Sequence, residues 1–230
     1  MEFKTLHKWV NNIDDAVELQ QDLSVKVIFE SVMQEPETIC AVDTAFDADS
    51  NYLFASAVTF SYPDLKEVEA AQSKQKTDFP YIPGLLAFRE GPAILDSLSG
   101  LKIIPEFILY RGHGIAHPRY FGLASHLGIW TGIPSAGCAL ENLAGDYVEP
   151  PREKGKWKPL FVDGNEVGSV YRSRSNVKPI FISPGHLCDT TDATNIVAVC
   201  LTSYRTPEPL RRAHLYAKKQ RDRFTGKERG

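Results

Sequence analysis

Three strand-like segments joined by short connections lie between residues 38 and 74, and they constrain the fold more than any other feature of the chain. Two of them are rich in apolar residues: TICAVDTAF begins at Thr38 and NYLFASAVTF begins at Asn51. The third, more polar segment runs from about Leu65 to Lys74. Strands that follow one another through tight turns pair antiparallel with their neighbours. The sequence therefore predicts an antiparallel meander in the first half of the chain.

The segment after this meander alternates helical and strand-like patterns. The proline-bounded FPYIPG precedes a helical pattern at about Leu85 to Leu98 and the apolar strand PEFILY. A second helix follows His117-Pro118, and the strand IPSAGCA comes after it. Alternation of strands and helices favours parallel pairing. We therefore expect a mixed sheet, in which the meander is followed by parallel strands and helices flank the sheet.

The remaining segments complete one α/β domain. Two apolar runs flank Asp163-Gly164, a pair typical of a hairpin turn, and KPIFIS is a further strand. Helical patterns occur at about Ile13 to Leu23, Asp192 to Ser203 and Pro207 to Lys219. Neither a repeat nor a break in composition divides the chain. We expect a single domain over residues 1–230 that ends in a basic, frayed tail at about residues 218–230.

Composition excludes several classes of protein. The 230 residues are 43% hydrophobic and 24% charged, which is typical of globular domains and not of fibrous, disordered or disulfide-scaffold chains. The cysteines lie far apart and form no CxxC pair, so they indicate neither a zinc finger nor a redox dithiol. They are Cys40, Cys138, Cys188 and Cys200. With no secretory signal and no membrane span, we expect buried thiols in a cytoplasmic protein without a membrane partner.

Positive charge is concentrated at the C-terminal end. From Arg205 to Gly230, nine Lys and Arg stand against three Asp and Glu, a local charge of +6 in a chain whose net charge is −3. A solvated helix face with a tail explains such a run, and so does a surface that binds phosphate groups. The second interpretation predicts phosphate contacts from four side chains: Arg211, Arg212, Lys218 and Lys219.

Two carboxylates lie in apolar surroundings. Asp43 has apolar neighbours on a strand that otherwise reads as core, so its charge requires an Arg, a Lys or a divalent metal ion as partner. Glu90 lies four residues from both Leu86 and Ile94, on the apolar stripe of its helix, although a solvent-facing pair with Arg89 is the simpler alternative. Two inward carboxylates are what a hard Mg²⁺ ion binds.

Two loop segments could approach a ligand. In RGHGIAHPR, glycines flank His113 directly after an apolar strand, where the backbone can come close to a ligand. His113 and His117 are four residues apart, but Gly114 and Pro118 favour a loop over a helical zinc pair. In PYIPG, Tyr81 stands between prolines. A rigid aromatic of this kind either packs in a core or acts as a wedge that unstacks bases.

Five segments, in this order, resemble endonuclease V, a family of repair nucleases that act at deoxyinosine. They are AVDTAF (41–46), PYIPGLLAFREGP (80–92), GHGIAHPRYFGLASHLG (112–128), KPIFISPGH (178–186) and YRTPEPLRRAH (204–214). The resemblance covers most of the chain. It implies a ribonuclease H-like fold, dependence on Mg²⁺ or Mn²⁺, and hydrolysis of the second phosphodiester bond 3′ to the lesion in DNA or RNA that contains inosine. We expect the protein to act as a monomer.

The resemblance also implies site residues. Asp43 and Glu90 match the family's metal ligands, and His214 matches its histidine near the site, which gives three catalytic residues. Pro80 to Pro83 is similar to the wedge, and Gly84 with Gly112 to Gly114 resembles the wall of the base pocket. The positions expected to bind substrate are Pro80, Tyr81, Ile82, Pro83, Gly84, Arg89, Gly112, His113, Gly114 and His117.

The chain departs from the family pattern at two positions. Arg111 stands where the family has a second metal-binding Asp before GHG, and Leu140 stands where the family has a Lys. An arginine carries no lone pair for a metal ion. We expect Arg111 to form an ion pair with Asp43 in the space of that ion.

Three functions stay open. The first is an active nuclease in which Asp189 or Asp192 replaces the lost ligand. The second is a catalytically impaired protein that still binds inosine-containing strands, and the third is a non-enzymatic interaction protein on the same fold. The intact PYIPG and GHG segments favour binding, while Arg111 and Leu140 favour impaired catalysis.

Overall fold

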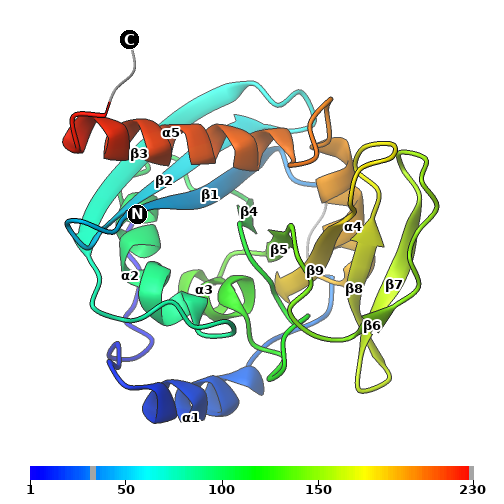
Figure 1. The fold of residues 1–230 in the computed structure, drawn as a ribbon, viewed down its shortest axis with the longest axis horizontal. Helices are drawn as coiled ribbons and strands as arrows, with labels where there is room; N and C mark the ends of the chain where they lie inside the picture. The colour runs from blue at the N-terminus through cyan, green and yellow to red at the C-terminus, as the bar shows by residue number, and fades with distance from the viewer. Residues whose placement is uncertain (32–34, 228–230) are drawn as a thin grey trace.

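A mixed β-sheet forms the centre of the protein. A computed structural model describes residues 1–31 and 35–227. Within those residues, nine strands form one sheet in the order β3-β2-β1-β4-β5-β9-β8-β7-β6 (Figure 1). The mixed α/β architecture expected from the sequence is confirmed.

The first three strands form the predicted antiparallel meander. They are β1 (Thr38–Asp47), β2 (Tyr52–Ser61) and β3 (Glu67–Lys76). Strand β1 pairs with β2 so that Asp43 lies opposite Ser56. Strands β1 and β2 are almost wholly buried, whereas β3, at the edge of the sheet, is mostly exposed, which agrees with its more polar sequence.

The next strands pair in parallel, as the alternation of elements predicted. Strand β4 (Phe107–Tyr110) lies beside β1, and β5 (Ser135–Ala139) lies beside β4. Every residue of both strands is buried, as parallel strands covered on both faces require. Strand β9 (Ile180–His186) then pairs antiparallel with β5 and joins the two halves of the sheet.

The other half of the sheet is antiparallel. It consists of β6 (Asp146–Tyr147), β7 (Trp157–Val162) and β8 (Asn165–Tyr171). Val162 pairs with Asn165, so Asp163 and Gly164 alone form the turn between β7 and β8. Both turn residues have positive φ angles, of 48° and 79°, as a two-residue hairpin with a primed turn requires. The hairpin predicted at this pair is confirmed.

Helices cover both faces of the sheet. They are α1 (Ile13–Ser24), α2 (Leu86–Ser99), α3 (Leu123–Thr131), α4 (Thr190–Val199) and α5 (Glu208–Phe224). Helix α5 packs across β1 and β2, and it is visible along the upper edge of Figure 1. It continues to Phe224, five residues beyond Lys219, where the Phe224 ring packs against Tyr52 and Phe54 on β2, at 5.3 Å and 5.4 Å between ring centres. The expected frayed tail therefore does not begin at residue 218, and residues 228–230 lie outside the described part of the chain.

Alternate residues of β1 serve two hydrophobic cores. Ile39 and Ala41 pack with residues of α4 and α5, whereas Cys40 and Val42 pack with residues of α2 and α3. This alternation follows from the two-residue period of a strand. It places Asp43, the next residue in the series with Ile39 and Ala41, on the face covered by α5.

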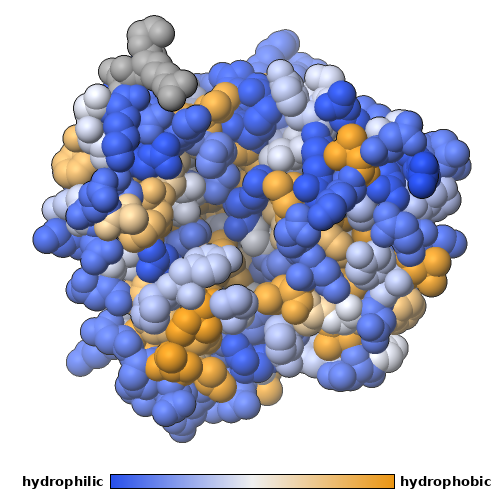
Figure 2. All heavy atoms as spheres, in the orientation of Figure 1, coloured by the Kyte–Doolittle hydropathy of each residue, from blue (hydrophilic) through white to orange (hydrophobic). Residues whose placement is uncertain are grey.

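Two further expectations concern the cysteines and the surface. All four cysteines are free and buried, as expected. None of the helices in the described ranges has both the length and the apolar composition that crossing a membrane demands. Figure 2 shows one face of the molecule, where hydrophilic residues predominate and apolar ones occur in scattered groups.

Candidate active site

Asp43 and His214 come together at the sheet. The Asp43 carboxylate is only 6% exposed, and its Oδ1 accepts a hydrogen bond of 2.7 Å from the backbone N–H of Thr44. Its Oδ2 lies 3.2 Å from Nδ1 of His214 on α5. The ring nitrogen is close but not aligned for a hydrogen bond, so this buried oxygen lacks a hydrogen-bond donor within the described residues. Two of the three expected catalytic residues are therefore adjacent.

Glu90, the third expected catalytic residue, lies near Asp43. It is on α2 and is partly buried, as its position on the apolar stripe predicted. Burial raises the pKa of the Glu90 carboxyl to about 8, and the negative charge of Asp43 adds to the effect. Two acidic groups that repel each other in this way favour a proton or a cation between them.

Arg111 follows β4 and lies beside this acidic pair. Its backbone N–H donates to the carbonyl oxygen of Val42, at 3.2 Å, which brings its backbone next to Asp43. The ion pair expected between Arg111 and Asp43 is absent from the described residues, so that prediction is wrong. The Asp43 carboxylate faces His214 on α5, while the Arg111 side chain extends to the loop before α5, where Nη1 donates to Thr206 Oγ1 at 3.5 Å.

The residues present do not fit a divalent ion held by the protein. The orphaned Oδ2 of Asp43 and the nearby Glu90 carboxyl could each give one oxygen ligand. Arg111 and Leu140, at the two positions that depart from the family pattern, provide none. Among the described residues, no three His, Cys, Asp or Glu side chains are grouped closely enough to hold a metal ion.

Neither Asp189 nor Asp192 replaces the missing ligand. Asp189 is the N-cap of α4, and its side chain accepts a hydrogen bond from the backbone N–H of Asp192 at 2.8 Å. Asp189 lines a different cavity, with Phe29 and Tyr120 among its neighbours. The substitution considered from the sequence is therefore not seen, because both side chains belong to the start of α4.

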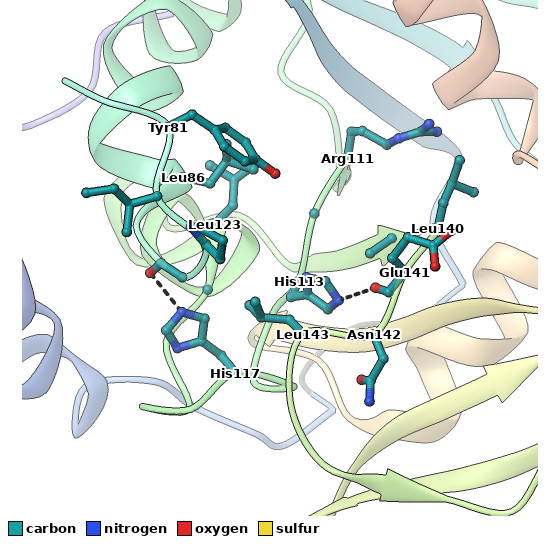
Figure 3. Close-up of a pocket in the computed structure, with 16 residues that line it drawn as sticks. Tyr81, Leu86, Arg111, His113, His117, Leu123, Leu140, Glu141, Asn142 and Leu143 are labelled. Atoms are coloured by element: carbon teal, nitrogen blue, oxygen red, sulfur yellow. Dashed lines mark hydrogen bonds between the residues drawn. The ribbon is translucent and has the colours of Figure 1, made fainter. Parts of the chain in front are cut away.

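A cavity of about 360 Å³ opens next to Arg111 (Figure 3). Three segments that are distant in sequence line it. They are residues 81–84 and Leu86, residues 111–113 with His117, Gly122 and Leu123, and residues 139–143. The expected wedge and the expected pocket wall thus meet around one space, and Arg111 connects this space with the acidic pair.

The wedge residues differ in exposure. Tyr81 is 71% exposed at the rim of the cavity, which excludes the alternative that it packs in the core. Pro80 is exposed but does not line the cavity. Arg89 does not line the cavity either; its guanidinium stacks 4.2 Å from the centre of the Phe46 ring and donates to the carbonyl oxygen of Phe79. Of these three residues expected to bind substrate, Tyr81 therefore lines the cavity, and Pro80 and Arg89 do not.

The carbonyl oxygen of Gly84 fixes the end of the wedge. It accepts hydrogen bonds from Nε2 of Gln20 (2.9 Å), Nε2 of His117 (2.8 Å) and Nη2 of Arg119 (3.2 Å). Gly84 itself has a φ of +85°, a conformation that other residues rarely adopt. Burial lowers the pKa of His117 to about 4. A neutral His117, expected to bind substrate, thus holds the wedge in place.

Gln20 and Arg119 were not identified from the sequence. Arg119 Nε donates to Gln20 Oε1 at 2.7 Å, and Gln20 also donates to the carbonyl oxygen of Phe121. Gln20 shares the buried stripe of α1 with Ala16 and Leu23. A polar residue on an apolar helix stripe is the signal that could have found it.

The GHG segment is held close to β9. The backbone N–H of Gly114 donates to Ser183 Oγ at 2.8 Å, and a Cβ on Gly114 would lie 1.9 Å from the carbonyl oxygen of Pro184. Gly114 is buried and does not line the cavity. His113 lines it, and its Nε2 donates to the carbonyl oxygen of Glu141 at 3.1 Å. Burial lowers the pKa of His113 to about 4, so its ring is neutral.

Comparison with known proteins identifies the family of the whole chain. Endonuclease V from Methanothrix thermoacetophila is 42% identical over 220 residues, which are 96% of this chain and 97% of that protein. Endonuclease V from Nostoc punctiforme is 41% identical over 212 residues, 92% of this chain and 96% of that protein.

Solved structures agree with these sequence relatives. The crystal structure of endonuclease V from Streptomyces avermitilis has a TM-score of 0.88 and 36% identity, with 94% of this chain and 96% of that chain covered. Endonuclease V from Ciona intestinalis, in complex with a 24mer DNA containing an inosine followed by a ribo-adenosine, has a TM-score of 0.81 and 25% identity, with 92% and 98% covered. The ribonuclease H-like fold implied by the sequence is thus confirmed. Because the family model for Endonuclease V also matches residues 21–215, the chain belongs to the endonuclease V family.

Proposed function

We propose that this protein binds nucleic-acid strands that contain inosine and takes the flipped hypoxanthine base into the cavity beside Tyr81. The observation that carries this proposal is the cavity itself, bounded by the wedge and the GHG segment (Figure 3). Its volume of about 360 Å³ suits a single base, since small-molecule sites begin at roughly 300 Å³. Base flipping allows a protein to inspect the edge that distinguishes inosine from guanine.

We infer that hydrolysis is impaired. The family is one of nucleases, which is consistent with a divalent metal cofactor, and Mg²⁺ or Mn²⁺ stabilises phosphoryl charge and activates water in such enzymes. This chain offers two carboxylates, while a guanidinium and an aliphatic side chain occupy the two positions that depart from the family pattern. The family reaction, cleavage of the second phosphodiester bond 3′ to the lesion, should therefore be slow in this protein.

The exposed wedge speaks against the alternative of a non-enzymatic interaction protein. If the PYIPG motif served only to pack the core, the side chain of Tyr81 would be buried. Tyr81 is instead 71% exposed at the rim of an open cavity. DNA and RNA are both candidate strands, and we expect a monomer to bind them.

The test scores binding and nicking separately. Single-stranded oligonucleotides of one sequence carry either inosine or guanosine at one position. We expect tighter binding of the inosine strand, and nicking in Mg²⁺ or Mn²⁺ that is little faster than that of Asp43→Asn. Equal affinity for the two strands would contradict the binding proposal. Fast nicking that Asp43→Asn abolishes would contradict the impairment.

A further inference from the structure

Within residues 1–31 and 35–227, Arg111 is a cation without an acidic partner. Its side chain makes one long hydrogen bond, of 3.5 Å, to the neutral hydroxyl of Thr206. Asp43, the carboxylate nearest in the sheet register, faces His214 instead. Among the described residues, no carboxylate forms an ion pair with Arg111. Since a guanidinium has five N–H donors, most of those on Arg111 are available to a ligand.

A second guanidinium, that of Arg205, lies behind the cavity wall and contacts Leu140 and Glu141, which line the cavity. Arg205 is held by three backbone carbonyl oxygens, those of Leu140 at 2.5 Å, Pro179 at 2.7 Å and Lys178 at 2.9 Å. Arg111 lines the same cavity as Leu140 and Glu141, so the two guanidinium groups belong to one region of the protein. Glu141 is the acidic partner of Arg205, at 3.9 Å, and its side chain is 74% exposed. Because Arg205 pairs with Glu141, the guanidinium of Arg111 is the charged group of the cavity lining that has no ion-pair partner among the described residues.

The position of Arg111 suits a phosphate of the bound strand. Arg111 lines the same cavity as Tyr81 and His113, so the backbone of a nucleotide whose base entered the cavity would pass close to it (Figure 3). The planar fork of an arginine donates two parallel hydrogen bonds to phosphate oxygens, and such charge-assisted pairs are among the strongest polar contacts in proteins.

We propose that Arg111 binds a backbone phosphate of the inosine-containing strand directly, so that this protein holds nucleic acid without a divalent ion. The inference rests on the proposed function, because it concerns the strand that the cavity accepts. It explains why a guanidinium can occupy a site beside two carboxylates. The arginine supplies a fixed positive charge at any accessible pH, where a metal ion would supply one only when bound.

The experiment measures the affinity of a fluorescent inosine oligonucleotide by anisotropy. Wild-type protein is titrated in EDTA and in MgCl₂ at matched ionic strength, and the titration is repeated at several salt concentrations. Arg111→Gln removes the charge, and Arg111→Lys keeps it without the fork. Arg152→Gln is the matched control, since Arg152 is exposed and does not line the cavity. Circular dichroism and thermal melting check that the variants fold.

We expect wild-type affinity to be the same in EDTA and in MgCl₂. Arg111→Gln should weaken binding about tenfold to a hundredfold, the scale of a hydrogen bond to a charged group. The log-log salt slope should fall by about 0.7, the share of one phosphate contact on a single strand. Arg111→Lys should keep the slope with reduced affinity, and Arg152→Gln should change neither.

Two results would overturn the inference and leave the proposed function intact. One is inosine-specific binding that EDTA abolishes, and the other is an Arg111→Gln protein with wild-type affinity and salt slope. Conversely, equal affinity for the inosine and guanosine strands, with the Arg111 effects as expected, would reject the proposed function and keep the phosphate contact. Absence of binding to either strand would overturn both.

Discussion

His117 links the two loops of the cavity through the carbonyl oxygen of Gly84. Its Nε2 donates to that oxygen at 2.8 Å, and its Nδ1 accepts from the backbone N–H of Arg119 at 3.1 Å. Because one ring nitrogen donates and the other accepts, the ring must be neutral and in a single tautomer. Gly84, the residue after the wedge at residues 80–83, is therefore bound to the GHG loop by a histidine that cannot take up a proton without losing a contact.

The first prediction concerns the pH dependence of stability. Burial lowers the pKa of His117 from 6.5 to about 4 in the folded protein. The unfolded chain therefore binds more protons below pH 6.5, and this histidine lowers the free energy of unfolding as the pH falls from 6.5 to 4. The full effect is on the order of 3 kcal/mol. Urea unfolding across this range should show a smaller decline for His117→Gln than for wild type.

Burial also lowers the pKa of His7, His113, His126 and His186, so the pH dependence of wild type alone would not isolate His117. Those groups affect both proteins equally. Parallel stability curves for wild type and His117→Gln would show that His117 titrates normally.

The second prediction concerns Tyr81. Tyr81→Ala should weaken binding of the inosine strand by roughly 1 to 3 kcal/mol, the usual scale for stacking of a base on an aromatic ring. Its melting temperature should stay unchanged, since the side chain is 71% exposed. Trp157→Ala, which removes an exposed aromatic on β7, is the control and should bind normally. A lowered melting temperature with unaltered affinity would assign Tyr81 a packing role.

The third prediction divides the basic residues of α5. Arg211 pairs with Glu208 at 2.6 Å, and Arg212 pairs with Glu67. Lys218 and Lys219 are exposed, and Lys218 lies one helical turn from His214 on the same face. We therefore expect the phosphate contacts of this helix to come from the two lysines.

Salt titrations test this division. Lys218→Gln with Lys219→Gln should flatten the log-log salt slope by about 0.7 per contact on a single strand. The double change Lys4→Gln with Lys8→Gln removes the same charge from exposed N-terminal positions and should leave the slope less affected. If both double variants change the slope equally, only net charge matters and α5 is an ordinary solvated helix.

The fourth prediction is a rescue of nicking. Arg111→Asp restores an oxygen ligand beside Asp43 and should raise Mg²⁺-dependent nicking of an inosine strand. Leu140→Lys adds a positive charge at the cavity, and one preorganised electrostatic group can contribute about 10²- to 10³-fold. The double variant should exceed the product of the single ones, because residues that act as a unit are not additive. A parent protein that nicks quickly, with a rate unchanged by Arg111→Asp, would disprove the impairment.

Local signals in the sequence determined most of the architecture. The apolar runs from Thr38 and Asn51 predicted β1 and β2, and the pair Asp163-Gly164 predicted the hairpin of β7 and β8. Such features depend on turn chemistry and hydrophobic period, which neighbouring residues specify. Family motifs identified two of the three segments that line the cavity. The structure added residues 139–143, of which the sequence had singled out only Leu140. The expected end of α5 was wrong, because the contact of Phe224 with Tyr52 and Phe54 of β2 forms only in the fold.

The sequence by itself determined which chemical groups the site contains, including the guanidinium in place of a carboxylate. Only the tertiary structure decided how those groups are paired. Arg111 extends to Thr206 while Asp43 faces His214, because α5 covers that face of β1. Gln20 holds Gly84 because α1 packs beside the wedge. A side chain's partner depends on elements that meet only in the fold, and no local pattern encodes that meeting.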